Sequence, residues 1–324
     1  MPASQRRASL IYNPNAGFWD WHDAIDDFAQ FWKRRGWSLQ VESTERPNHA
    51  TDLARAAVAA GHRLVFAAGG DGTLNEVANA LIGTDAVLAP LPAGTANVLA
   101  KEFGLPLPNL LMPNWIIQVS RSLAQGRIRR MDAGQNEESG RHWLLWASTG
   151  VDGYIVNQVE PRSRWLKRLG KLGYLAKALL HLPSYRSPHA VVTVDDRTLE
   201  GEYLMVNASN IRMFLGGEVN LNRNAVLDDG QFEIWLLRWR EWSKLAEYAL
   251  EMTLEQHEQD PDVTVLTGRN VAVRCSPPIQ YHLDGEPAGD TPFTCRLRPQ
   301  ALHILTPDTA PDDLFSLSGD PLPG

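Results

Sequence analysis

The stretch from Leu64 to Leu81, LVFAAGGDGTLNEVANAL, constrains the fold of this chain more than any other. It opens with five apolar residues, a length and content that suit a buried strand. From Leu74 onward the apolar residues recur every three or four positions, as they do on one face of a helix. Glycines and polar residues separate the two patterns. The stretch therefore predicts a strand, a tight turn and a helix, in that order.

The turn itself, Gly69–Thr73, has the composition of an anion site. The N-terminus of a helix offers unpaired N–H groups and the positive end of the helix dipole, and glycines let a phosphate approach the backbone. Asp71 would repel a phosphate unless a metal ion lies between them. We therefore predict a site for a nucleotide with its magnesium ion. The alternative is a plain turn with Thr73 as N-cap.

Length and charge narrow the class of protein. A chain of 324 residues is long enough for two domains, and its net charge of −7 argues against nucleic acid as a partner. Cys275 and Cys295 are too few for a disulfide framework, so we expect free thiols in a reducing compartment. The sequence has neither an 18-residue apolar window nor a secretory signal at its start. We expect a cytoplasmic protein, with contact to the inner face of the membrane left open.

Strands and helices alternate through the first part of the chain, which indicates βαβ crossovers and a parallel sheet. We therefore predict an α/β nucleotide-binding domain over residues 1–130. The loops Asn13–Gly17 and Gly94–Asn97 each follow a predicted strand, so they should lie at the same sheet edge as the Gly69–Thr73 turn. The predicted strands are 8–12, 37–44, 64–68 and 86–91, and the predicted helices are 19–35, 51–60, 74–81, 98–103 and 115–125.

From about residue 131 the pattern is mostly short apolar strands bounded by turn residues, which predicts a β-rich second domain over 131–306. Two helices are expected in it, at 161–182 and 242–258. The expected strands are 142–148, 190–194, 203–207, 232–237, 271–275 and 302–305. The tail, 307–324, is rich in Pro, Asp, Gly and Ser and is predicted to be disordered.

Two acidic turns in this second domain could carry chemistry. Asp228 and Asp229 precede Gly230, and the pair suits either a turn between strands or a site for a hard cation. Asp284-Gly285-Glu286 is a hairpin signal whose two carboxylates could also supply a general base. A base is what a kinase acting on an alcohol requires.

Five motifs, taken in their order along the chain, resemble those of the diacylglycerol kinase catalytic-domain family. They are Asn13-Pro14, the GGDGT turn with Asn75-Glu76, Gly94-Thr95-Ala96-Asn97, Asp229-Gly230 and Asp284-Gly285-Glu286. That family includes bacterial lipid kinases, sphingosine kinases and ceramide kinases. GGDGT alone is shared with NAD kinases, and phosphofructokinases have a close relative of it. The resemblance runs from about Ser9 to Thr306. It implies an α/β nucleotide domain, a sandwich-like lipid domain and a cleft between them.

The resemblance also implies roles for individual residues. Glu286 is similar to the family's general base, with Asp284 in support and Asp71 facing it across the cleft. Asp229 and the backbone carbonyls of Val226 and Gln231 resemble a structural magnesium site. The expected nucleotide-binding residues are Asn13, Gly17, Thr44, Gly69, Gly70, Asp71, Gly72, Thr73, Leu74, Asn75, Glu76, Gly94, Thr95 and Asn97.

The segment 161–190 mixes leucines with basic residues and has no acidic residue, which suits a basic amphipathic helix on anionic lipid. The alternative is a solvated helix face whose leucines pack on the protein. We expect a lipid substrate at a membrane surface and leave a homodimer open. The basic residues are Arg162, Arg164, Lys167, Arg168, Lys171, Lys177 and Arg186.

The sequence thus predicts a kinase that uses ATP and Mg²⁺ to phosphorylate a lipid hydroxyl. The alternatives are an NAD kinase, which shares GGDGT, and a lipid- or nucleotide-binding regulator without turnover. Diacylglycerol, phosphatidylglycerol, a sphingoid base and monoacylglycerol all remain open as substrates, because the predicted lipid domain consists of ordinary apolar strands.

Overall fold

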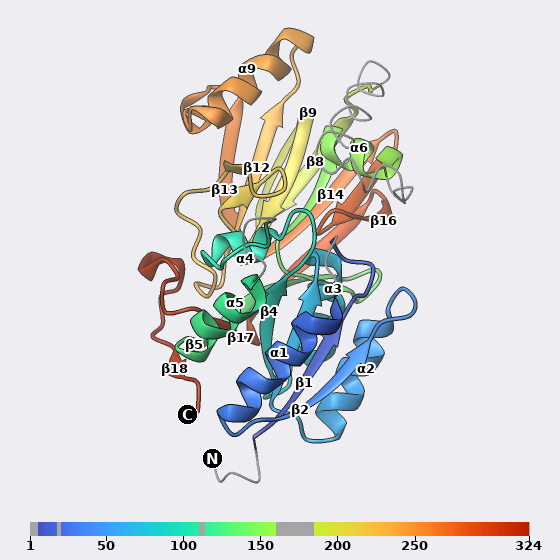
Figure 1. The fold of residues 1–324 in the computed structure, drawn as a ribbon. Coiled ribbons are helices and arrows are strands. Elements are labelled where there is room, and N and C mark those ends of the chain that lie inside the picture. Colours follow the sequence, from blue (N-terminus) through green and yellow to red (C-terminus); the bar gives the residue numbers. More distant parts are fainter. Residues whose placement is uncertain (1–5, 18–20, 110–113, 160–184, 324) are drawn as a thin grey trace. The chain divides into compact units, whose positions relative to one another are not determined.

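The computed structural model describes residues 6–17, 21–109, 114–159 and 185–323. The chain forms two compact units, and each is described by itself (Figure 1). Unit 1 comprises residues 1–133, 226–229 and 299–324, and unit 2 comprises 134–225 and 230–298. The first segment of unit 1 ends at residue 133, and the sequence prediction placed a boundary after residue 130. Unit 1 also takes up a short inner segment and the end of the chain, which the sequence patterns did not indicate.

Unit 1 is built on a parallel sheet in the order β17-β4-β3-β1-β2. Every residue of β3 and β4 is buried, because helices cover both faces of the sheet. This explains why these strands read as continuous apolar runs. The strands are β1 (Arg7–Tyr12), β2 (Ser38–Ser43), β3 (Leu64–Gly69), β4 (Val87–Pro92) and the second half of β17 (Phe293–Thr306).

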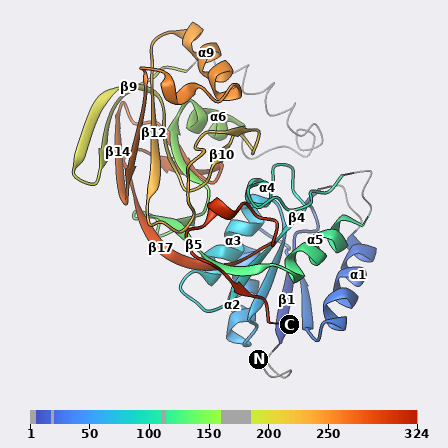
Figure 2. The ribbon, with the colours of Figure 1, turned by 90° about the vertical axis from the view of Figure 1, so that its left-hand side faces the viewer.

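Figure 2 shows α1 and α5 on one face of this sheet and α2 and α3 on the other. The α1 face that meets the sheet carries Phe28 and Trp32, both fully buried, and the ring of Phe28 packs edge-on against that of Phe66, 4.9 Å away. The predicted α/β architecture is therefore confirmed. The helices are α1 (Trp21–Arg34), α2 (His49–Ala59), α3 (Asp71–Leu81), α4 (Val98–Glu102) and α5 (Trp115–Ala124).

Unit 2 is a sandwich-like arrangement of antiparallel strands. The long strand β9 joins its layers, since its first half pairs with β8 and its second half with β7 and β12. The core between the layers contains Trp143 stacked on Phe232, at 4.7 Å, and Tyr281 stacked on Phe293, at 4.4 Å. The strands are β6 (His142–Trp143), β7 (Trp146–Gly150), β8 (His189–Val194), β9 (Arg197–Ser209), β10 (Met213–Phe214), β11 (Val219–Asn220), β12 (Phe232–Arg238), β13 (Val263–Gly268), β14 (Asn270–Ser276), β15 (Gln280–Leu283) and β16 (Glu286–Asp290).

Unit 2 also contains α6 (Val151–Val159), α9 (Trp242–Thr253) and the short 3-10 helix η3 (His257–Gln259). The predicted helix 242–258 therefore ends early and is followed by η3. The predicted helix 161–182 lies outside the described residues. Among the described residues, no helix is both long and apolar enough to cross a bilayer. Cys275 and Cys295 are buried free thiols, as predicted.

The predicted strand 142–148 is two strands, β6 and β7. The break has a physical cause, because the N–H groups of Leu144, Leu145 and Trp146 donate to the carboxylate of Asp284, at 2.8, 2.8 and 3.1 Å. These N–H groups are therefore not available to a neighbouring strand. A side chain distant in sequence interrupts a run that local pattern reads as continuous.

The end of the chain is folded against unit 1, contrary to the predicted disorder. It carries the 3-10 helix η4 (Asp312–Leu314) and strand β18 (Asp320–Pro321), which pairs with β5 (Arg127–Asn136). Leu314 is fully buried. The buried carboxylate of Asp228 accepts hydrogen bonds from the N–H groups of Ser316 and Leu317, at 2.6 and 2.9 Å. Partners outside the tail supply the order that its own composition does not favour.

Candidate active site

The carboxyl ends of four parallel strands in unit 1 meet at one edge of the sheet. Tyr12 of β1 lies in register with Ser43 of β2 and Ala68 of β3, and Gly69 with Pro92 of β4. The loops after these strands therefore converge, as predicted. The strand order reverses between β1 and β3, and such a switch point is where open α/β sheets bind ligands.

The GGDGT segment continues directly into helix α3. Gly70 is the extended N-cap of α3, and its carbonyl accepts the first helical hydrogen bond from Leu74 N, at 3.1 Å. Asp71 to Thr73 thus form the first turn of the helix, which was predicted to begin at Leu74. N–H groups in this turn have no acceptor within the helix, so the turn offers donors to an anion at the sheet edge.

Asp71 connects two helix starts. Its carboxylate accepts the N–H of Val98, the first residue of α4, at 2.7 Å. A carboxylate at this position stabilises the start of α4, because it satisfies a donor that has no intrahelical partner. The hydrogen bond from Val98 therefore holds the carboxylate of Asp71 at the edge of the sheet.

Asn97 holds the Gly94–Asn97 loop closed. Its side-chain oxygen accepts the N–H of Gly94, at 2.8 Å, and its amide nitrogen donates to the Gly94 carbonyl, at 2.9 Å. A methyl group on Gly94 would lie 2.4 Å from the Cα of Gly70. Gly94 is therefore required by the close contact between the two loops.

The loop after β1 is tied to the same turn. Asn13 N–H donates to the carbonyl of Ala68 at 2.9 Å, and the Asn13 amide lies 3.5 Å from the hydroxyl of Thr73. After β2, the N–H of Thr44 donates to Tyr12 at 2.9 Å. The predicted loops thus form one hydrogen-bonded edge.

Glu76 has a structural task that the sequence did not reveal. Its carboxylate accepts the N–H groups of Asn48 and Ala50, at 3.0 and 3.1 Å, at the start of α2. The hydroxyl of Thr51, the first residue of the predicted helix 51–60, donates to the Glu76 carbonyl at 2.8 Å. The cap residue is Asn48. Glu76 therefore positions α2 against α3.

The remaining predicted nucleotide contacts differ in how accessible they are. Thr95 and Gly17 are exposed, and Thr44 is half-buried. Leu74 and Asn75 are buried, and the Asn75 side-chain oxygen accepts a hydrogen bond from Asn79 at 2.9 Å. The buried side chains of Leu74 and Asn75 support the turn. These two residues can contact a ligand only through their backbone groups.

The residues around the turn fit a phosphate group with its cation. A cavity of about 10 Å³ has room for one water molecule but not for a phosphate group; it is lined by Gly69, Gly70, Asp71 and Asn97 and by the apolar or proline residues Ala67, Leu74, Pro90, Leu91, Pro92 and Ala100. A methyl group built on Gly70 would lie 3.5 Å from the Cα of Gly94, which is an ordinary van der Waals contact. N–H donors suit phosphate oxygens, and the carboxylate of Asp71 suits Mg²⁺. A larger hollow of about 350 Å³ lies between α1 and α5, away from this edge.

In unit 2, Asp284 is buried beneath a tight turn. Burial raises the pKa of its carboxyl group, while the three N–H groups of residues 144–146 and the charge of Arg141 oppose that rise. The main-chain N–H of Asp284 in turn donates to the Trp146 carbonyl, at 2.9 Å. Asp284 is therefore an anchor for the turn, consistent with a supporting role beside Glu286.

Glu286 begins β16, immediately after the turn. Its carboxylate forms an ion pair with Arg141, with the Arg Nη2 and Glu Oε2 atoms 2.6 Å apart, and 47% of its side chain is exposed. The exposed carboxylate can reach a substrate, and the guanidinium fixes its direction. Arg141 was not singled out by the sequence, since it lies in a polar loop 145 residues away.

A second polar group lies on the opposite side of β15 from the core. His282 alternates with Tyr281 and Leu283, which both belong to the core cluster. The His282 ring lies between Gly285, in the turn, and Asp152, in α6. Neither Asp152 nor His282 was predicted as a site residue, although strand alternation could have marked His282 as a polar residue facing away from the core.

The two carboxylates of the Asp228-Asp229-Gly230 turn lie in different environments. Asp228 is buried, and its two oxygens accept the N–H groups of Ser316 and Leu317 in the tail. Asp229 is exposed and Val226 is half-buried. A carboxylate with turn carbonyls from Val226 and Gln231 is a set of hard oxygen donors of the kind Mg²⁺ takes, so the chemistry of the predicted ligands fits.

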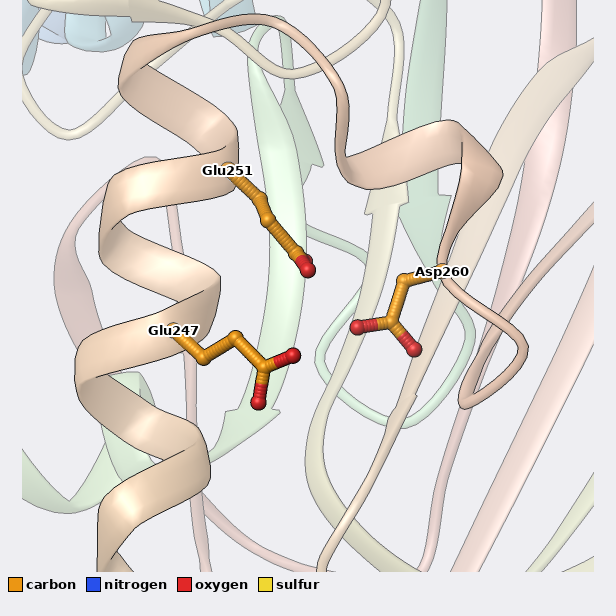
Figure 3. Close-up of side chains that lie close together, drawn as sticks. All are labelled: Glu247, Glu251 and Asp260. Atoms are coloured by element: carbon orange, nitrogen blue, oxygen red, sulfur yellow. The ribbon is translucent and has the colours of Figure 1, made fainter.

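One acidic cluster of unit 2 has its own counter-charge. Glu247 and Glu251 of α9 point toward Asp260 (Figure 3). Lys244 lies among them, with its ammonium 2.5 Å from Asp260 and 3.1 Å from Glu247. Burial and the neighbouring Asp260 raise the pKa of Glu251. The ammonium group of Lys244 already provides Asp260 and Glu247 with a counter-charge, so this cluster gives no reason to expect a metal ion.

The fold defines the class of this protein: an α/β domain built on a parallel sheet, combined with a β-sandwich-like domain. Residues 7–136 match the diacylglycerol kinase catalytic domain, and residues 146–306 match the YegS C-terminal NAD kinase beta sandwich-like domain. The chain belongs to this family of lipid kinases.

Individual relatives match over nearly the whole chain. A Bacillus subtilis protein named diacylglycerol kinase is 27% identical over 95% of this chain and 99% of its own length. A Pseudomonas syringae protein named "Probable lipid kinase YegS-like" is 30% identical over 95% of this chain and 96% of its own. Family membership thus supports a kinase.

The fold has a counterpart among solved structures. The crystal structure of a diacylglycerol kinase from Bacillus anthracis matches with a TM-score of 0.70 at 20% identity, covering 94% of this chain and 98% of that one. At this identity the match concerns the fold alone. It agrees with the predicted pair of an α/β domain and a β-rich domain.

Proposed function

We propose that this protein is a lipid kinase that transfers the γ-phosphate of ATP to a lipid hydroxyl. The observation that carries the proposal is the convergence of Asp71, the first turn of α3 and the Gly94–Asn97 loop at the switch point of a parallel sheet. Membership in a kinase family implies ATP as the phosphate donor. Relatives named diacylglycerol kinase favour a diacylglycerol-like acceptor over a sphingoid-like one.

The N–H groups of the α3 first turn would hold phosphate oxygens, with Gly70 allowing close approach. Mg²⁺, when bound, would neutralise charge on the phosphates. Asp71 would hold the ion at the sheet edge, and Asp229 with the Val226 and Gln231 carbonyls would hold a second, structural one. Asp71 is kept in place by Val98 N–H.

Glu286 would act as the general base. Its carboxylate takes the proton from the lipid hydroxyl as that oxygen bonds to the γ-phosphorus, and the bond from phosphorus to the β,γ-bridging oxygen breaks to release ADP. Arg141 orients the carboxylate, and Asp284 fixes the turn that presents it. Positioning and charge neutralisation supply most of the catalysis.

The Glu286→Gln variant tests this assignment. It keeps the side-chain size and a partner for Arg141 but cannot take a proton, so turnover should fall by about 10²–10⁴-fold while ATP affinity is retained. The matched control is Asp290→Asn, which removes an exposed carboxylate from the same strand and should leave turnover unchanged. Near-normal turnover in Glu286→Gln would show that another group is the base.

The segment 161–190 is proposed to dock the enzyme on anionic lipid. The support is its sequence alone, in which leucines alternate with basic residues in a chain of net charge −7. Of its basic residues, Arg186 lies in the described part of the chain, where its guanidinium donates to the Tyr185 carbonyl at 3.0 Å. Arg186 therefore has a local structural contact as well.

A further inference from the structure

The imidazole of His282 is fully engaged, although the residue lies on the side of β15 away from the core. Its side chain is 3% exposed. The Nδ1 atom lies 3.2 Å from the main-chain N–H of Gly285, and the Nε2 atom lies 3.3 Å from a carboxylate oxygen of Asp152. A backbone N–H can only donate, so Nδ1 must be the acceptor. The proton of the neutral ring is then on Nε2, directed at Asp152.

Asp152 is itself held in place. It lies in the first turn of α6, and the hydroxyl of Ser148 donates to the same carboxylate oxygen that faces His282. Its other oxygen accepts the N–H of Gly153 at 2.8 Å. Ser148 and His282 are directly opposite each other on β7 and β15. A continuous chain of hydrogen bonds therefore runs from Ser148 through Asp152 and His282 to Gly285.

The end of this chain is the turn that presents Glu286. Asp284 and Gly285 both have positive φ, 52° and 78°, between the paired residues Leu283 and Glu286, as in a two-residue type I′ hairpin. Three N–H groups of residues 144–146 hold the first turn residue through its carboxylate. His282 holds the second through its N–H. That second contact acts on the residue that is bonded to Glu286.

We propose that His282 is a positioning residue for phosphoryl transfer, and that Asp152 serves it by selecting the tautomer whose Nδ1 accepts from Gly285. This inference rests on the proposed role of Glu286 as general base. A histidine that merely fills space in unit 2 would need only shape and a satisfied ring. Here each ring nitrogen has a different partner, and the carboxylate partner is held by a third side chain. Such an arrangement orients an imidazole ring, because the partner of one ring nitrogen fixes which nitrogen carries the proton.

Two substitutions of His282 separate the contacts. In His282→Asn the amide oxygen falls near the position of Nδ1, so it can accept from Gly285, but the side chain does not reach Asp152. In His282→Gln the amide nitrogen falls near the position of Nε2 and can donate to Asp152, but the Gly285 N–H loses its acceptor. Both variants are polar, uncharged and smaller than or similar to imidazole.

We expect His282→Asn to keep turnover within about threefold of the wild type, and His282→Gln to lower kcat by about tenfold or more, with KM for ATP and lipid unchanged in both. Equal turnover in the two variants, or a larger loss in His282→Asn, overturns the proposal. Asp152→Asn, which leaves His282 in place, provides a second comparison. It should lower kcat without changing KM, because an amide can donate to Nε2 and so favour the wrong tautomer.

Amide hydrogen exchange at Gly285 gives a readout that does not depend on activity. Exchange should be slow in the wild type and in His282→Asn and faster in His282→Gln. The same rate in all three would show that the Gly285 contact is not made, and the proposal would fail. If exchange follows the expected order but Glu286→Gln retains turnover, then the general-base assignment has failed and not the histidine contact.

Discussion

At the scale of single residues, three carboxylates of the candidate site accept main-chain N–H groups from other elements. Asp71 accepts Val98 N–H, Glu76 accepts Asn48 and Ala50 N–H, and Asp284 accepts three N–H groups of residues 144–146. Each holds a loop or a helix start of its own unit in place. The residue types were predictable from the sequence. Their partners were not, because they lie 27, 28 and about 140 residues away.

The role of Glu76 can be tested through stability. Glu76→Ala removes the acceptor for two N–H groups at the start of α2, so the free energy of unfolding should fall by about 1–2 kcal/mol. The midpoint of thermal unfolding should then drop by roughly 2–6 °C for a domain of this size. The exposed neighbour Glu45 is a matched control, and Glu45→Ala should change neither quantity measurably.

A different result would support the prediction from sequence that Glu76 contacts the nucleotide. If Glu76→Ala unfolds like the wild type but has a raised KM for ATP, its carboxylate contacts the nucleotide complex directly. If stability falls and KM for ATP is unchanged, the helix-capping role accounts for the residue.

At the scale of elements, patterns within a short window predicted most of unit 1. Strands β3 and β4 are buried on both faces, so their apolar runs were unambiguous. Helix starts were less predictable, since α3 includes the polar residues Asp71 to Thr73 and α2 is capped from Glu76. In unit 2, the break between β6 and β7 depends on Asp284, which no local pattern near residue 144 reveals.

The ion pair between α9 and the loop after η3 is a second test at this scale. Lys244 is 14% exposed and Asp260 1% exposed, so Lys244→Met leaves a buried carboxylate without its counter-charge. The free energy of unfolding should fall by about 3 kcal/mol. In the double variant Lys244→Met/Asp260→Asn the loss should be smaller. A larger loss in the double variant would contradict the ion-pair account.

The same pair predicts a pH dependence. Burial acts to raise the pKa of Asp260, but Lys244 and the Asp262 N–H outweigh it and hold that pKa below its usual 3.8. A carboxyl group whose pKa is lower in the folded state stabilises the protein above the unfolded-state pKa and loses this effect as the pH falls through the folded value. The stability difference between wild type and Asp260→Asn should therefore be constant from pH 5 to 7 and shrink below about pH 3.8. A constant difference down to pH 2 would contradict it.

At the scale of the whole molecule, the order of motifs predicted the family and the pair of domains, whereas composition misjudged the tail. Residues 307–323 lack the apolar content for independent order, yet Leu314 and Phe315 are buried and the tail N–H groups find Asp228. The ring of Phe315 also lies 6.2 Å from that of Phe103. Order in this segment is a property of the whole unit 1.

Membrane docking belongs to this scale as well. If the segment 161–190 binds anionic lipid, Arg162→Glu/Arg164→Glu should weaken sedimentation with phosphatidylglycerol vesicles by at least about tenfold, since each basic residue contributes about 1 kcal/mol. The control reverses two exposed arginines of unit 1, Arg55 and Arg121, which should leave binding unchanged. Equal binding by both double variants would rule out docking through this segment.

The central claim is that this protein transfers the γ-phosphate of ATP to a lipid hydroxyl. Its most direct test is transfer of label from [γ-³²P]ATP with Mg²⁺ to vesicles containing diacylglycerol, monoacylglycerol, phosphatidylglycerol or a sphingoid base, with NAD as a parallel acceptor. We predict that label appears in lipid and is greatest in diacylglycerol. The Glu286→Gln variant should transfer label only at its low residual rate. Label in NADP instead, or in no acceptor while ATP still binds, would contradict the account.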